Sequence, residues 1–83
     1  MTRDELVEKF RALASEIAER DLSHVTEEQA IADLGMDSLS TLELVGELER
    51  EFGVSLPEED LVGVRTVKDL LDLVHRGMDD GAR

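Results

Sequence analysis

Few side chains in this 83-residue sequence could do covalent chemistry. There is no cysteine, so a thiolate nucleophile and a disulfide are both excluded. The Ser38 hydroxyl, the imidazoles of His24 and His75, and any of the aspartates would supply the residue types of a serine hydrolase triad. However, Ser38 stands in Gly-Met-Asp-Ser-Leu rather than in the Gly-x-Ser-x-Gly of a nucleophile elbow. Both histidines lie in polar or terminal segments, and we therefore expect no enzymatic activity.

Carboxylates dominate the charge of the chain. The 21 acidic and nine basic residues give a formal charge of −12. No Asp-x-Asp-x-Asp-Gly loop closed by Glu is present, and Asp79-Asp80-Gly81 is too short, so we predict no metal site. Nucleic acids and anionic membranes are disfavoured as partners, because binding them requires a basic face. A basic protein surface is the complementary partner, although excess acid can also serve solubility alone.

Ser38 lies at the start of a helix predicted over residues 38–52. Asp37 is its expected N-cap and Gly53 its C-terminal stop. By position alone, Ser38 would be a second capping group. At about 100° per residue, one side of this helix forms a core stripe. That stripe contains Thr41, Leu44, Val45, Leu48 and Phe52.

The opposite side of this helix combines apolar and acidic residues. Leu39 lies off the core stripe and is expected to stay exposed, close to Leu42, Glu43 and Glu47. An apolar spot ringed by carboxylates is typical of a docking surface for a basic partner. Gly46 costs about 1 kcal/mol relative to Ala in mid-helix. It either leaves room for a partner or is simply tolerated at the surface.

Other segments must pack against this helix to position it. A capping box at Thr2 and Glu5 and an apolar period through Leu6, Phe10, Leu13 and Ile17 predict a helix over about residues 3–19. Residues 20–36 read as a long loop, anchored by apolar side chains and with a turn of helix near residues 26–29. A short helix should begin at Pro57, and a last helix should run from Thr66 to Gly77.

No alternating pattern indicates a strand, so the predicted fold class is all-α. Three longer helices and one short third helix would surround one aliphatic core. The N-terminus lacks an apolar signal segment, and no apolar run is long enough for a membrane span. We therefore expect a cytoplasmic protein.

Several motifs together resemble the acyl carrier protein family. They are Asp33-Leu34-Gly35-Met36-Asp37-Ser38-Leu39, then Leu42-Glu43-Leu44-Val45, and later Glu49-Arg50-Glu51-Phe52-Gly53. The segment Gly-x-Asp-Ser-Leu is similar to that family's phosphopantetheine attachment motif. The Leu-Pro-x-Glu-Asp turn and the Thr-Val-x-Asp-Leu last helix follow in family order. The similarity covers about residues 3–76.

The resemblance implies a four-helix bundle of acyl-carrier type, with a carrier domain over residues 1–77 and a flexible tail over 78–83. It implies that a phosphopantetheinyl transferase attaches 4'-phosphopantetheine from coenzyme A to Ser38, next to Asp37 and Leu39. Acyl groups would then travel as thioesters on the terminal thiol of this arm. The imported sulfur agrees with a chain that has no cysteine, and a tether raises the effective concentration of cargo at successive active sites.

The resemblance also implies that the chain acts as a monomer with acyl-loading enzymes, ketosynthases or other acyl-processing enzymes that carry basic docking patches. The expected partner-binding residues are Leu42, Glu43, Gly46, Glu47 and Glu49. Ser40 stands where many fatty-acid carriers have Asp, Gly46 where they often have Met, and Arg50 interrupts the acidic row. These departures favour polyketide or related secondary metabolism. Fatty-acid synthesis, an aminoacyl or peptidyl carrier, and a helical interaction domain in which Ser38 only caps remain as alternatives.

Overall fold

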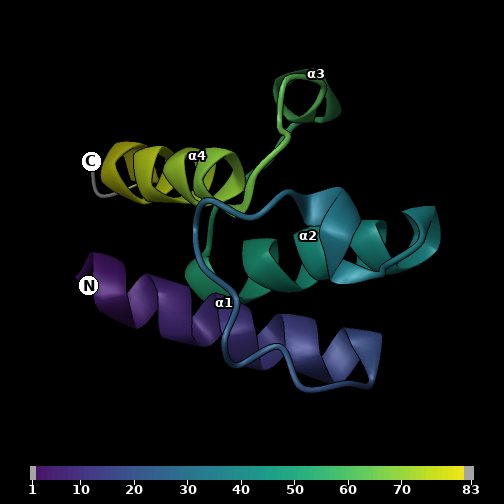
Figure 1. Cartoon of the computed structure of the whole chain (residues 1–83). Coiled ribbons are helices and arrows are strands. Elements are labelled where there is room, and N and C mark those ends of the chain that lie inside the picture. Colours follow the sequence, from purple (N-terminus) through teal and green to yellow (C-terminus); the bar gives the residue numbers. More distant parts are fainter. Residues whose placement is uncertain (1, 82–83) are drawn as a thin grey trace.

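The computed structural model describes residues 2–81 and is helical throughout its regular structure (Figure 1). Four α-helices and no β-strand occur in these residues, so the all-α prediction is confirmed. The elements are α1 (Arg3–Ala18), the 3₁₀ helix η1 (Ile31–Leu34), α2 (Ser38–Phe52), α3 (Glu58–Leu61) and α4 (Val67–Gly81). Helix α2 contacts both α1 and α4, whereas the short α3 stands apart from them.

The core lies between α1, α2 and α4 and is almost entirely aliphatic. Helix α1 contributes Leu6, Phe10 and Ala14, and its first turn is held by the predicted capping box between Thr2 and Glu5. Helix α2 contributes Leu44, Val45 and Leu48, whereas Thr41 and Phe52 from the predicted stripe are only partly buried. The apolar face of α4 consists of Val67, Leu70, Leu71 and Val74, and all four are buried.

The long loop between α1 and α2 packs along the start of α4. The backbone N–H of Ile31 donates to Arg65 O at 2.9 Å, and the N–H of Val67 donates to Gln29 O at 3.0 Å. The helical turn predicted over residues 26–29 is wrong. That segment is a hydrogen-bonded turn, and the helical turn lies further on, at η1. Leu22, which the pattern did not single out, is buried in the core.

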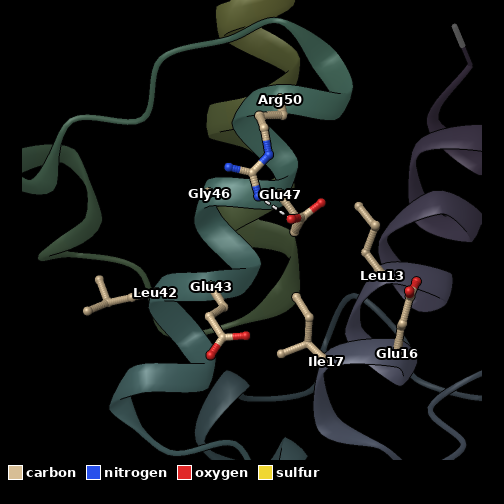
Figure 2. Close-up of a pocket in the computed structure, with 8 residues that line it drawn as sticks. All are labelled: Leu13, Glu16, Ile17, Leu42, Glu43, Gly46, Glu47 and Arg50. Atoms are coloured by element: carbon tan, nitrogen blue, oxygen red, sulfur yellow. Dashed lines mark hydrogen bonds and ion pairs between the residues drawn. The ribbon is translucent and has the colours of Figure 1, made fainter.

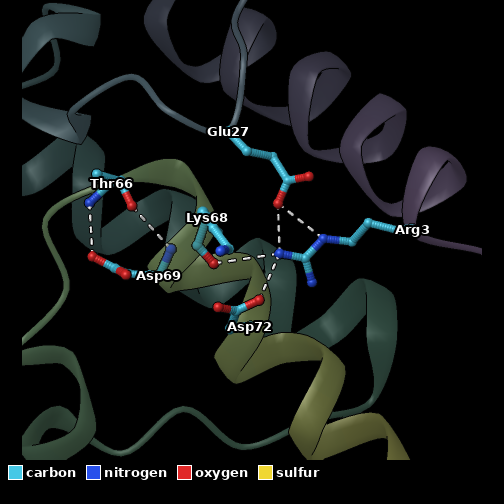
Figure 3. Close-up of polar contacts among 6 residues, drawn as sticks. All are labelled: Arg3, Glu27, Thr66, Lys68, Asp69 and Asp72. Atoms are coloured by element: carbon cyan, nitrogen blue, oxygen red, sulfur yellow. Dashed lines mark hydrogen bonds and ion pairs between the residues drawn. The ribbon is translucent and has the colours of Figure 1, made fainter.

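A single guanidinium fastens this loop to two helices. Arg3 on α1 donates to the Glu27 carboxylate at 2.9 Å and to the Asp72 carboxylate on α4 at 2.7 Å (Figure 3). It also reaches the backbone oxygen of Lys68 at 3.5 Å. The hydrogen bond to Glu27, followed by the one to Asp72, raises the pKa of Arg3, while burial opposes the rise. The contact joins three segments that are distant in the sequence.

Helix α4 begins as predicted but ends later. Thr66 and Asp69 form a reciprocal cap, each accepting a hydrogen bond from the other's backbone N–H at 3.1 Å. The predicted stop at Gly77 is wrong, because α4 continues to Gly81. A Cβ at Gly77 would lie 3.1 Å from the Val54 Cβ, so this glycine permits close packing rather than ending the helix. Of the predicted tail, residues 82–83 lie outside the described residues.

Helix α3 is the least anchored element. It has four residues, none of them buried, and Pro57 stands just before it rather than at its first position, without a side-chain cap. Within residues 2–81, no helix is both long and apolar enough to cross a bilayer. The predicted location in the cytoplasm stays a prediction.

Candidate functional site

Ser38 is the first residue of α2, and its side chain is exposed. Asp37 is the N-cap, as predicted, because its carboxylate accepts the backbone N–H of Ser40 at 2.8 Å. The carbonyl of Asp37 also accepts the backbone N–H and the hydroxyl of Thr41, both at 2.9 Å. Among residues 2–81, no hydrogen bond uses the Ser38 hydroxyl. Asp37 therefore does the capping and leaves this hydroxyl open to reagents from solution.

The cap should make the stability of α2 depend on pH. Hydrogen bonds from Ser40 hold the pKa of Asp37 below its ordinary value. A carboxylate with a lower pKa in the folded chain stabilises the fold above its unfolded pKa, and this contribution is lost as pH falls through the folded pKa.

We expect Asp37→Ala to have a lower urea midpoint than wild type at pH 7. The difference between the two midpoints should disappear as pH falls below about 4. Urea titrations of both proteins between neutral pH and about pH 2 measure this difference in midpoint. A gap of constant size across that range would contradict an ionised cap.

An apolar groove opens next to Ser38. It has a volume of about 810 Å³ and is bounded by η1, α2, α3 and the start of α4. Ser38 and Asp37 lie on its edge, and Arg65 and Glu58 are its other charged residues. Its apolar lining includes Ile31, Met36, Val45, Leu61, Val64 and Leu70. We call this the α2–α3 groove. Its size and lining suit an aliphatic chain attached near Ser38.

The outer side of α2 carries Leu39, whose exposure was predicted, and next to it Leu42. Leu39 is 67% exposed and Leu42 is 63% exposed, which confirms that both lie off the core. A second groove, of about 520 Å³, runs between this side of α2 and α1, and we call it the α1–α2 groove (Figure 2). It brings together four of the sequence-predicted residues with Arg50 and three residues of α1. The lining is Leu13, Glu16, Ile17, Leu42, Glu43, Gly46, Glu47 and Arg50.

Two of the predicted docking residues, Glu49 and Gly46, differ in whether the fold itself uses them. Glu49 lies outside the α1–α2 groove, and its carboxylate accepts the backbone N–H of Leu56 at 2.8 Å. It therefore holds the turn that follows α2. At Gly46, a Cβ would have no neighbour within 4 Å, so no internal contact requires a glycine there.

The sequence pattern missed the part of this groove that α1 supplies. Leu13 and Ile17 lie one helical turn apart on the edge of the α1 apolar stripe, and both are half-buried. Their spacing indicated packing, but nothing in the pattern showed that they meet the outer side of α2. Within the described residues, no group of His, Cys, Asp or Glu is arranged to hold a metal ion.

Comparison with known proteins connects these features to one family. Residues 8–74 match the family described as the phosphopantetheine attachment site. An acyl carrier protein of Thermosynechococcus vestitus is 38% identical over 76 residues, which are 90% of this chain and 94% of that protein. The chain belongs to the acyl carrier protein family. The crystal structure of an acyl carrier protein from Thermotoga maritima has a TM-score of 0.85 and 37% identity, covering 94% of this chain and 92% of that one.

Polyketide carriers are also among the proteins similar to this acyl carrier protein. The solution structure of the hexanoyl carrier from the actinorhodin polyketide synthase of Streptomyces coelicolor has a TM-score of 0.75 and 32% identity, covering 96% of this chain and 93% of that one. A non-reducing polyketide synthase of Emericella nidulans is 31% identical over 80 residues. Those residues are 96% of this chain but only 3% of that synthase.

Acyl carrier proteins are carriers rather than catalysts, and they hold a covalently attached 4'-phosphopantetheine. The arm supplies the thiol on which an acyl group is held as a thioester. The residues of this chain fit such a group, because Ser38 offers an exposed hydroxyl without a hydrogen bond in residues 2–81. The N-terminus of α2 also favours the negative charge of a phosphodiester.

Proposed function

We propose that Ser38 carries the phosphopantetheine arm of this acyl carrier protein. The observation that carries the proposal is the exposed Ser38 hydroxyl at the start of α2, on the edge of the apolar α2–α3 groove. Asp37 supports it by taking over the cap, so esterification of Ser38 removes no hydrogen bond that holds the helix. The adjacent groove offers an aliphatic cargo a place out of water.

The outer side of α2 is the surface that we propose for partner enzymes. Acyl carrier proteins interact with acyl-processing enzymes such as ketosynthases. Leu39 and Leu42 provide exposed apolar area close to the arm, and Glu43 provides charge for a basic patch. Glu47 lies on the same surface but is paired with Arg50. We leave Glu49 out of this surface because its carboxylate is engaged with Leu56.

The pathway that we propose is polyketide or related secondary metabolism. Three residues of α2 support it, since Ser40 and Gly46 depart from the fatty-acid pattern and Arg50 places a positive charge in the acidic row. Ser40 leaves no carboxylate after Ser38 in the first turn of α2. The similarity to the actinorhodin carrier supports the same pathway.

Mass spectrometry of the protein purified from its native host tests both parts of this proposal. We expect one phosphopantetheine arm on the peptide that contains Ser38, and an acyl group with keto or other oxygen substituents along its chain. Fragmentation separates Ser38 from Ser40 because the two serines are in different positions of one peptide. If every molecule carries the arm on another residue and Ser38 is unmodified, the proposed attachment site is wrong. Only saturated acyl chains would assign the protein to fatty-acid synthesis, and an aminoacyl cargo to peptide assembly.

A further inference from the structure

The α1–α2 groove has two walls, and only one of them belongs to the proposed docking surface. Leu13 and Ile17 project from α1 toward α2, while Leu42 forms the outer rim on the far side (Figure 2). These side chains are half-buried or exposed, so the groove has an apolar floor that is open to solvent. A partner that contacts the outer side of α2 could reach α1 without any rearrangement of the helices.

The groove contains one ion pair and two carboxylates that form none among the described residues. Arg50 forms an ion pair with Glu47 in the next turn of the same helix, which neutralises the end far from Ser38. Glu16 on α1 and Glu43 on α2 take part in no ion pair among the described residues. Glu43 lies five residues after Ser38, about 7.5 Å along the helix axis. Each wall of the groove therefore carries one carboxylate without an ion pair among the described residues, and the one on α2 lies toward the arm.

Gly46 widens the groove at its middle. A Cβ at this position would meet nothing within 4 Å, so the missing Cβ serves no internal packing. It does leave the α2 backbone accessible between Glu43 and Glu47. A partner side chain can approach the helix here more closely than it could beside any larger residue.

From these observations we infer that α1 forms half of the docking site, and that Glu16 is its charged contact. The occupant is a basic amphipathic segment of an acyl-processing enzyme. Its aliphatic side chain rests on Leu13 and Ile17 beside Gly46, and its Lys or Arg residues pair with Glu16 and Glu43. Charge complementarity selects this occupant, because the two carboxylates have no ion pair among the described residues and belong to a chain of formal charge −12. The inference rests on the proposed function and extends its partner surface to a second helix.

Charge reversal on α1 tests the inference with the phosphopantetheine-loaded protein. The probe is acyl transfer by a ketosynthase–chain-length-factor pair of a polyketide system and by a ketosynthase of bacterial fatty-acid synthesis. We expect Glu16→Lys to raise KM about two- to fivefold at low salt, with kcat little changed, because exposed ion pairs contribute factors of this size. Glu43→Lys should do the same, and added salt should reduce both effects.

Glu28→Lys is the matched control. Glu28 is exposed, lies outside the α1–α2 groove, and has no ion pair or hydrogen bond among the described residues. Its reversal changes the net charge by the same amount as Glu16→Lys. An equal rise in KM for both variants would mean that only overall charge matters, and would overturn the assignment of Glu16.

Gly46→Leu supplies a second test that does not depend on charge. Leucine is a better helix former than glycine, and its Cβ would meet no neighbour within 4 Å here, so the melting temperature should rise by about 2–5 °C. The same side chain should fill the groove and raise KM at any salt concentration. A stabilised variant with wild-type KM would show that no partner enters the groove.

The failures of the inference and of the proposed function can be told apart. If wild type never acquires the arm, the proposed function fails. If the loaded wild type is accepted by neither ketosynthase, the partner class is wrong and the inference falls with it. If transfer depends on Glu43 but not on Glu16 or Gly46, docking uses α2 alone, and only the inference is overturned.

Discussion

Ser38→Ala is expected to acquire no phosphopantetheine when it is incubated with coenzyme A and a broad-specificity phosphopantetheinyl transferase. Under the same conditions the wild type should gain the mass of one arm. The loss should be complete, because the substitution removes the one oxygen to which the phosphate would be esterified. Intact-mass spectrometry of both proteins over a time course measures the result.

The fold of the Ser38→Ala variant should be intact, which keeps this result interpretable. Asp37 remains as the cap, and the hydroxyl that is lost makes no hydrogen bond in residues 2–81. Ser40→Ala is the matched control, since it removes another hydroxyl from the same turn and keeps the backbone N–H that Asp37 binds. Arm attachment to Ser38→Ala, or its loss in Ser40→Ala alone, would move the site away from Ser38.

The second large effect is expected in the core, for Phe10→Ala. Phe10 has no exposed surface and is the largest side chain in the core. Truncation of a buried phenylalanine costs about 3–5 kcal/mol from lost burial and the remaining cavity. A domain of this kind has a free energy of unfolding of about 5–15 kcal/mol, so the substitution should remove about a fifth or more of it. Urea unfolding followed by circular dichroism gives the difference between the two free energies.

Leu39→Ala is the control for the core substitution. Leu39 is 67% exposed, so its truncation should change the free energy of unfolding by no more than about 0.5 kcal/mol. A loss below about 1 kcal/mol for Phe10→Ala would contradict the close packing of α1 against the core. Equal losses for the two variants would contradict the placement of Phe10 in the core and of Leu39 on the surface.

Those parts of the fold that depend on neighbours in sequence could be predicted. The bounds of α2 were correct because Asp37 caps it, Gly53 ends it with a positive φ of 64°, and the apolar period between them is regular. The end of α4 could not be predicted. A glycine such as Gly77 is a common helix stop signal. Here it instead makes room for Val54, which packs against it from another segment. The position of η1 likewise depends on pairing with residues near Thr66.

The candidate site divides in the same way. The exposure of Leu39 and the capping role of Asp37 follow from helical angle and position, so the sequence was sufficient for both. The surroundings of Glu49 depend on a turn seven residues later in the chain, and the α1 wall of the groove depends on helix packing. Periodicity identifies the buried side of each helix but does not show which outer sides lie next to each other.

The weak anchoring of α3 bears on how the molecule opens. No residue of α3 is buried, and Leu61 is its one residue packed against the core, so displacement of α3 leaves the shared core of α1, α2 and α4 in place. Local opening here therefore has a much lower free energy than global unfolding. The α2–α3 groove shares Leu61 with this segment, so its width can change while the cooperative unit stays folded. For a cargo held in this groove, as proposed above, differences in bulk would be accommodated by a local fluctuation, at a cost that is separate from the stability of the domain.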